Sequence, residues 1–263
     1  MEEHIPGKRL VVIGDIHGQL EPFVKILQHA QLINAHWDWC GGETRVIQMG
    51  DVYDRGPKST EADLLLYKLQ RQAADSTGEV VRLVGNHELE IMLGNFAICG
   101  LDETEAEIIR KRFNQQVLDG ELRGAYGYKN ILFTHAGVTC KLMRIFEQQL
   151  EEINAYNLAT LINLIFKESI RHQFFKHPIF NISVHRQGTD RFGGIFWEDI
   201  ADLIHGYPKQ SPLWQVIGHT QVDHIIIDSK TRLIPVDVGM HRKLQYLEIE
   251  KGSSTPLIRT VES

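Results

Sequence analysis

Apolar and polar positions alternate in blocks along the first 90 residues and predict strands and helices in turn. Three short runs rich in β-branched residues predict strands at 9–13, 44–49 and 79–84. Between them, apolar residues recur every three or four positions over 20–33 and 59–74, which is typical of helices that bury one face. Strands that alternate with helices predict an α/β fold.

The middle of the chain adds helical blocks to this alternation. The charged stretch 101–119 predicts one helix, and 141–173 predicts two, the second with apolar residues at core spacing. We therefore expect one domain over residues 1–263, with helical insertions at about 94–125 and 141–175.

The second half of the chain returns to strand patterns. The runs predicted as strands are 130–134, 213–217, 225–228, 232–238 and 244–249. The final segment, GSSTPLIRTVES, is expected to be partly frayed because it is short and polar.

Five predicted strands end in the same way, with a glycine beside a metal-ligating or acid–base side chain. The five segments are Gly14-Asp15-Ile16-His17-Gly18, Gly50-Asp51 with Asp54-Arg55-Gly56, Gly85-Asn86-His87-Glu88, His135-Ala136-Gly137 and Gly218-His219-Thr220. Ligands of α/β sheets bind at the carboxyl ends of strands, and glycine lets backbones approach closely. If these ends lie on one side of the fold, the five clusters converge on one site.

Each cluster taken alone has an ordinary alternative. Asp51 could be a turn residue, Asn86 the N-cap of a helix over HELEIML, and His135 or His219 a core histidine. The coincidence at five strand ends favours a shared site over five separate explanations.

The combined side chains are typical of a metal centre. They offer two carboxylates, three imidazoles and one amide oxygen, from Asp15, Asp51, His17, His135, His219 and Asn86. This mixed set suits Mn²⁺, Fe or Zn²⁺ better than Ca²⁺ or a structural Cys₄ zinc site. Because it exceeds the needs of one tetrahedral ion, we expect two divalent metal ions bridged by a carboxylate, Mn²⁺ first and Fe or Zn²⁺ as alternatives.

Composition narrows the range of partners and the cellular compartment that we expect for the protein. A net charge of -6 gives no general attraction to nucleic acid or to an anionic membrane, so an anionic substrate needs metal ions or local arginines. Three cysteines, Cys40, Cys99 and Cys140, form no C-x-x-C pair and are expected to be buried thiols without a disulfide framework. No 18-residue apolar run and no signal-peptide pattern is visible, so we expect a cytoplasmic protein.

The motifs GDIHG, GDVYDRG, GNHE, THAG and GHT occur in this order, with DVGM near the end. This set resembles the phosphoprotein phosphatase (PPP) group of calcineurin-like metallophosphoesterases, and the ending resembles the Shewanella-like branch most. Rhizobiales-like phosphatases and diadenosine tetraphosphatases share the motifs. The resemblance implies a four-layer αββα sandwich, in which two mixed sheets are flanked by helices with a helical cap.

The resemblance also implies metal ligands. Asp15 and His17 would hold the first metal, and Asp51 would bridge both. The ligands of the second metal would be Asn86, His135 and His219.

Three residues would carry the remaining chemistry. The resemblance makes His87 the general acid and Asp54 its partner, a pairing that keeps an imidazole charged and oriented. Arg55, whose planar fork matches phosphate oxygens, would bind the substrate together with Asn86.

One departure concerns a second phosphate-binding arginine that relatives carry. In the comparable segment 193–203 this chain has Glu198 and Asp199, an acidic pair expected to disfavour very anionic substrates. The candidate replacements are Arg186, Arg191 and Arg242, each expected to be a solvated surface residue. The unassigned His224 and His241 are likewise expected to be structural or surface residues.

Three functions compete. The leading hypothesis is a metal-dependent phosphomonoester hydrolase acting on a phosphorylated protein or peptide, or on a small phosphate ester, with no nucleic-acid or membrane partner. The second is a dinucleotide polyphosphate hydrolase of the diadenosine tetraphosphatase kind. The third, a non-catalytic metal-binding scaffold, is disfavoured because all six ligand positions and His87 are present.

Overall fold

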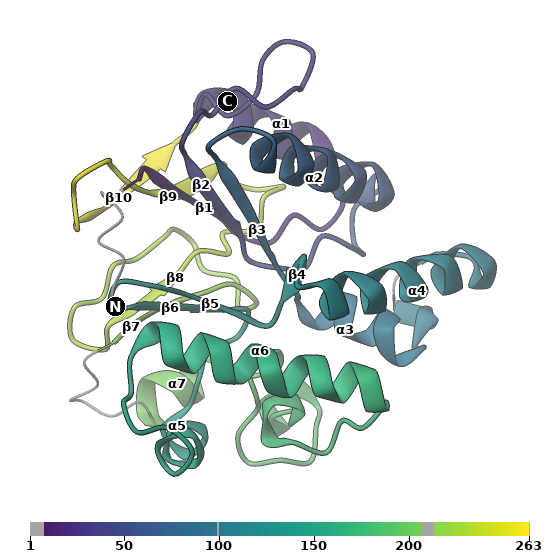
Figure 1. Ribbon diagram of the computed structural model, residues 1–263, viewed down its shortest axis with the longest axis vertical. Helices are drawn as coiled ribbons and strands as arrows, with labels where there is room; N and C mark the ends of the chain where they lie inside the picture. The colour runs from purple at the N-terminus through teal and green to yellow at the C-terminus, as the bar shows by residue number, and fades with distance from the viewer. Residues whose placement is uncertain (1–7, 99, 207–212, 263) are drawn as a thin grey trace.

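The computed structural model describes residues 8–98, 100–206 and 213–262 and contains two β-sheets (Figure 1). The larger sheet has the strand order β10-β9-β1-β2-β3-β4. Its strands are β1 (Leu10–Ile13), β2 (Arg45–Gln48), β3 (Glu79–Leu83), β4 (Leu122–Arg123), β9 (Gln245–Ile249) and β10 (Pro256–Thr260). Strands β1 to β4 are parallel, whereas β9 is antiparallel to β1 and to β10, so the sheet is mixed.

The smaller sheet has the order β5-β6-β7-β8. Its strands are β5 (Ala125–Tyr128), β6 (Ile131–Thr134), β7 (Trp214–Ile217) and β8 (Leu233–Pro235). β5 is antiparallel to β6, and β6, β7 and β8 are parallel, so this sheet is mixed as well.

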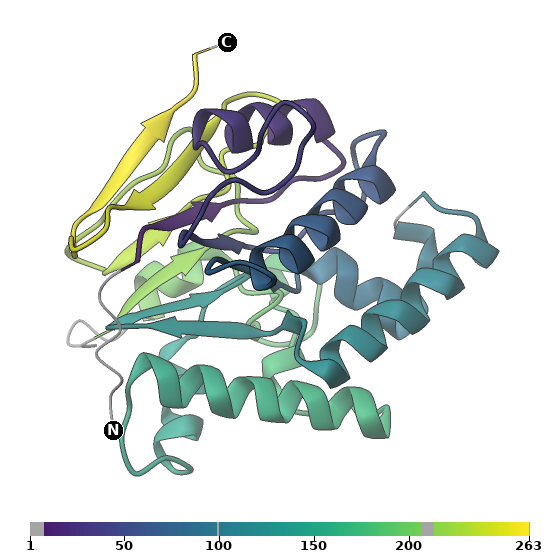
Figure 2. The same ribbon diagram turned by 45° about the horizontal axis from the view of Figure 1, so that its top comes forward.

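The two sheets face each other, and helices cover their outer faces (Figures 1 and 2). On the larger sheet lie α1 (Leu20–His29) and α2 (Ser59–Ala74); on the smaller sheet lie α5 (Cys140–Glu147), α6 (Ala155–His172) and α7 (Ile200–Gly206). The predicted arrangement of two mixed sheets flanked by helices is confirmed.

Strand β1 shows why this sequence builds four layers. Its residues are all buried; Val11 and Ile13 pack with the helices, whereas Val12 packs between the sheets against residues such as Phe133 and Val216. Side chains alternate between the faces of a strand, so a strand covered on both faces is apolar at every position.

The remaining helices lie at the β4 edge and in the connections. They are α3 (Asn86–Leu93), α4 (Glu103–Asp119) and the 3₁₀ turns Phe96–Ile98, Pro178–Phe180 and Val184–Arg186. Helix α4 begins where the Asp102 carboxylate accepts the backbone N–H groups of Thr104 and Glu105, and it ends at Gly120 in the left-handed conformation. The segment expected as the first insertion thus holds α4, and the second holds α5 and α6.

Several local predictions were wrong. The segment 225–228 is irregular apart from a single bridge from Asp228 to Leu233, because the chain leaves the sheet there. The tail is not frayed over its whole length, since β10 pairs with β9 as a half-exposed edge strand that lacks a strong apolar pattern. The short strands β4 and β5 and helix α7 were not predicted.

Two further predictions concern the cysteines and membrane-spanning helices. Cys40 is exposed and Cys140 is half-buried, so neither is the buried thiol expected, and both are free; Cys99 lies outside the described residues. Of the helices in the described ranges, none is both long and apolar enough to cross a membrane.

Candidate metal centre and active site

The five polar clusters meet because their strands run the same way within each sheet. Asp15 and His17 follow β1, Asp51 follows β2, and Asn86 follows β3, all parallel strands of the larger sheet. His135 and His219 follow β6 and β7, which are parallel neighbours in the smaller sheet. The clusters therefore lie at the carboxyl ends of both sheets.

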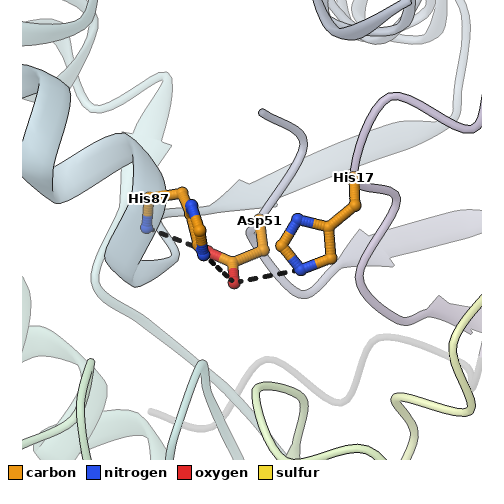
Figure 3. A group of neighbouring side chains, drawn as sticks. All are labelled: His17, Asp51 and His87. Carbon is orange, nitrogen blue, oxygen red and sulfur yellow. Dashed lines mark hydrogen bonds and ion pairs between the residues drawn. The ribbon is translucent and has the colours of Figure 1, made fainter. Parts of the chain in front are cut away.

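Asp51 is surrounded by the first group of side chains that could hold a metal ion (Figure 3). Its Oδ2 lies 3.5 Å from His17 Nε2 and 3.8 Å from His87 Nε2, and all three residues are buried. His17 Nδ1 donates to the Tyr53 carbonyl at 2.9 Å, which leaves Nε2 as the ring atom facing Asp51. This buried Nε2 has no hydrogen-bond partner in the described part of the chain, as a metal-ligating nitrogen requires.

The second group contains Asp51, His135 and His219. His135 Nε2 lies 3.5 Å from Asp51 Oδ2 and 3.0 Å from Asn86 Oδ1, while its Nδ1 donates to the Met49 carbonyl at 2.8 Å. His219 Nε2 is buried and also lacks a partner among the residues described. Because Asp51 belongs to both groups, the donor set fits two divalent ions that share one carboxylate.

Asp15 lies close to Asp51 and to Asp237, a carboxylate to which the sequence assigned no role. Asp15 Oδ2 accepts the backbone N–H of His219 at 3.0 Å. Asp237, from the DVGM motif, is buried, and its Oδ2 has no hydrogen-bond partner within the described ranges. Burial, together with Asp237 and Asp51, raises the pKa of Asp15 well above its usual range. Such crowded carboxylates favour a bound cation.

His17, His219 and Asp51 have the protonation that metal binding needs, whereas Asp51 outweighs burial and raises the pKa of His135 while no ion is bound. Burial lowers the pKa of His17 to about 4 and lowers that of His219 well below its usual range, so both rings are neutral at pH 7. Burial opposes the ionisation of Asp51, but His135, His87 and His17 hold its pKa well below the ordinary value. Neutral imidazoles and an ionised carboxylate are the ligand forms of these side chains.

Backbone strain is concentrated in the loop that carries Asp51. The φ angles of Asp51, Asp54 and Arg55 are 53°, 72° and 68°, a left-handed region that costs energy for non-glycine residues. A Cβ at Gly85 would lie 2.1 Å from Asp51 Oδ1, so only glycine fits there. Gly85 is the N-cap of α3, and the alternative that Asn86 serves as that cap is wrong.

Glu88, a motif residue left without a role by the sequence, supports this loop. Its buried carboxylate accepts the backbone N–H groups of Asp51, Val52 and Tyr53 at 2.7, 2.8 and 3.1 Å, and that of Gly85 at 2.9 Å. Four such bonds offset part of the desolvation of this carboxylate, whose pKa burial and Asp51 still raise, and they fix two motif loops relative to each other.

The three residues expected to carry acid–base and phosphate chemistry lie together. His87 Nδ1 is 3.2 Å from Asp54 Oδ2, and His87 Nε2 is 3.5 Å from Arg55 Nη2. The His87 backbone N–H donates to Asp51 Oδ1 at 3.0 Å, which ties α3 to the centre. The arginine side chain is at the surface, where an incoming anion can reach it.

Arg186 and the segment around Glu198 lie close to the second ligand group. Arg186 Nη2 lies 3.0 Å from Asp199 Oδ2 and donates to Thr220 Oγ1, next to His219, at 2.5 Å. The expectation that Arg186 is a solvated surface residue is wrong, because its side chain is only 25% exposed. Arg191 instead stacks on Phe192, and Arg242 pairs with Asp223 at the surface.

Comparison with known proteins defines the class. The calcineurin-like phosphoesterase family model matches residues 8–223, so the chain belongs to that family. The expectation of a phosphoester hydrolase is therefore confirmed at the level of the family.

The chain is similar to phosphatases of the Shewanella-like group within this class. It is 26% identical over 261 residues to Shewanella-like protein phosphatase 1 of Plasmodium berghei (strain Anka), covering 94% of this chain and 67% of that protein. It is 42% identical over 99 residues to Shewanella-like protein phosphatase 2 of Arabidopsis thaliana, which is 36% of this chain and 25% of that protein. Its fold is similar to that of a cold-active protein-tyrosine phosphatase of a psychrophilic Shewanella species (TM-score 0.65, 18% identity, 97% of this chain and 80% of that one).

Proposed function

We propose that this protein is a phosphomonoester hydrolase that uses two divalent metal ions, with phosphorylated proteins or peptides as its main substrate class. The observation that carries the proposal is the buried Asp51 carboxylate, which is shared by two groups of potential ligands. Asp15, His17 and Asp51 would hold one ion, and the ligands of the other would be Asp51, Asn86, His135 and His219. When bound, such a pair of ions supplies a nucleophilic water and neutralises phosphate oxygens.

The residues of the chain supply the proton and the anion contacts. His87 donates a proton to the leaving oxygen, and Asp54, 3.2 Å from its Nδ1, orients the ring. Arg55 contacts the phosphate with its planar fork, and Asn86 contacts it from the second ligand group. Arg186 serves as a second positive charge on the opposite rim, since it reaches Thr220 beside His219.

An assay of product identity tests this function. The protein loaded with Mn²⁺ is incubated in parallel with phosphopeptides and with diadenosine tetraphosphate, and free phosphate and nucleotides are quantified. We expect phosphate release from the peptides. Nucleotide products alone would support the dinucleotide polyphosphate hydrolase, and no product from either substrate would support the scaffold.

The Asp51→Asn variant is the matched control for the metal centre. Removing the shared carboxylate charge is expected to lower the metal content below two ions per chain and to abolish turnover. Full metal retention in this variant would contradict a bridging role. Reconstitution of the wild-type protein with Mn²⁺, Fe²⁺ or Zn²⁺ identifies the ion that restores most activity. That this ion is manganese, and that the protein is cytoplasmic, stay predictions.

A further inference from the structure

A pocket of about 300 Å³ opens beside the metal centre. Asp15, His17 and Arg55 form the wall nearest the metal ligands, and the remainder is formed chiefly by Gln19, Gln221, Met240 and His241. The same arginine that would contact phosphate therefore also lines the pocket. A phosphate held at the centre would therefore lie next to this pocket.

Gly239 brings the two sides of the pocket together. Its φ is +65°, and a Cβ added there would lie 3.2 Å from His241 Cε1 and 3.3 Å from Gln221 Cδ. Its backbone N–H donates to the buried Asp237 Oδ1 at 2.8 Å, which anchors the turn to the carboxylate beside the centre. The absence of a side chain at Gly239 thus lets Gln221 and His241 lie close to each other over the turn.

The lining has groups free to bind a ligand. Gln221 and His241 are exposed, and neither side chain makes a hydrogen bond or ion pair within the described ranges of the chain. The amides of Gln19 and Gln221 can both donate and accept, the imidazole adds a further polar group, and Met240 offers an adaptable apolar contact. This combination matches peptide amide groups next to an aliphatic or aromatic side chain.

The size of the pocket limits what it can hold. Small-molecule sites usually measure about 300–1,000 Å³, so this pocket is at the lower end of that range. A pocket of this size suits one organic substituent next to the phosphate, whereas a dinucleotide would need room for two nucleosides.

We propose that this pocket, which we call the Gln221–His241 pocket, holds the organic group of the phosphomonoester, and that Gln221 and His241 select peptide substrates. The proposal rests on the proposed function, because it needs phosphate to bind at the metal centre. It gives His241 a binding role that the sequence did not indicate.

Two substrates that differ in organic group test the proposal. One is a phosphopeptide, and the other is acetyl phosphate, which is too small to fill the pocket. We expect Gln221→Ala combined with His241→Ala to lower kcat/KM for the phosphopeptide at least tenfold, mainly through KM, and to change kcat/KM for acetyl phosphate less than twofold. Arg242→Ala, a surface neighbour outside the pocket, is the control and should change neither value.

A second variant probes the space itself. Gly239→Ala should raise KM for the phosphopeptide more than for acetyl phosphate, because its methyl group displaces Gln221 and His241; its melting temperature shows whether the turn still folds. Equal losses on both substrates, or no loss on the phosphopeptide in the double variant, would overturn the specificity role. A wild-type protein that hydrolyses neither substrate overturns the proposed function as well, whereas normal wild-type turnover with unaffected variants overturns this proposal alone.

Discussion

At the scale of single residues, the imidazoles of the centre are oriented by bonds to the backbone. His17 and His135 each use Nδ1 to donate to a carbonyl, of Tyr53 and Met49 respectively, and each turns Nε2 toward Asp51. A donated Nδ1–H fixes the tautomer in which Nε2 carries the lone pair. The orientation of both rings is therefore set by the backbone before any ion binds.

His87 can be distinguished as an acid or as a ligand. It lies within the first ligand group, yet it also pairs with Asp54, as a general acid would. We expect His87→Asn to lower turnover of a phosphoserine peptide by about 10²–10⁴-fold with the metal content unchanged. The loss should be smaller for para-nitrophenyl phosphate, whose leaving group needs no proton. If one ion per chain is lost instead, His87 is a ligand and not the acid.

Replacing Arg186 tests whether this residue is the second contact for the phosphate. Its guanidinium lies beside Thr220 and is paired with Asp199, so removing it should weaken substrate binding without disturbing the ligands. We expect Arg186→Ala to raise KM for a phosphopeptide about tenfold, consistent with the loss of one charge-assisted contact. Arg191→Ala, which removes only a stacking contact on Phe192, is the control. An unchanged KM in Arg186→Ala would remove this arginine from the site.

At the scale of elements, the strained loop after β2 is held by a network of contacts that involves α2, β3 and α4. The Tyr53 hydroxyl donates to Asp63 Oδ2, on α2, at 3.2 Å. The same buried carboxylate pairs with Arg82 on β3 and Arg112 on α4. Through Arg112 and Asp63, helix α4 is therefore linked to Tyr53, in the loop that carries Asp54 and Arg55.

Removing the Tyr53 hydroxyl measures this support. Tyr53→Phe leaves Asp63 paired with both arginines, so we expect a loss of only about 1 kcal/mol in unfolding free energy. Because the loop loses an anchor, turnover should fall roughly three- to tenfold with metal content unchanged. Denaturant unfolding and steady-state kinetics measure the two effects, with Tyr67→Phe on α2 as the control. A stability loss without any kinetic change would limit Tyr53 to a structural role.

Glu198, in the segment before α7, makes stability depend on pH. Burial raises the pKa of this fully buried carboxyl from 4.5 to about 8. The unfolded chain ionises above pH 4.5 while the folded chain keeps the proton, so this group lowers stability progressively between pH 4.5 and 8.

Glu198→Gln should remove that penalty. At about 1.4 kcal/mol per pH unit, we expect the unfolding free energy of the variant to exceed that of the wild type by roughly 4 kcal/mol at pH 8, and by nearly nothing at pH 4.5. Urea unfolding across this pH range measures the difference, and Glu61→Gln, at an exposed position of α2, serves as the control. A stability difference that does not grow with pH would contradict the raised pKa.

The sequence predicts the elements whose pattern is local and misses those whose role depends on distant contacts. The five motif segments are recognisable because each follows an apolar strand, and parallel strands bring their carboxyl ends together. Glu88 and Asp237 are different, since their partners are backbone groups and carboxylates that only folding brings near. Strand β10 was missed for a related reason, because an edge strand that is half exposed has no strong apolar pattern.

At the scale of the whole molecule, the metal centre lies where the two sheets meet. Asp15, Asp51 and Asn86 come from the larger sheet, whereas His135 and His219 come from the smaller one. Elsewhere between the sheets lies an apolar cluster that includes residues such as Val12 and Phe133. Ions held by both sets of proposed ligands would therefore connect the two halves of the sandwich.

Metal removal should consequently destabilise the fold as well as abolish activity. Without ions, burial and the neighbouring carboxylates raise the pKa of Asp15 and Asp237, so their ionised forms are disfavoured in the folded chain. A ligand present at 100 times its dissociation constant stabilises the native state by about 2.7 kcal/mol. For a chain of this size we expect chelation to lower the melting temperature by roughly 5–10 °C, with recovery when Mn²⁺ is restored. The Asp51→Asn variant, which lacks the shared ligand, should show a much smaller response to the chelator. A wild-type melting temperature that is the same with and without chelator would show that the ions do not join the sheets.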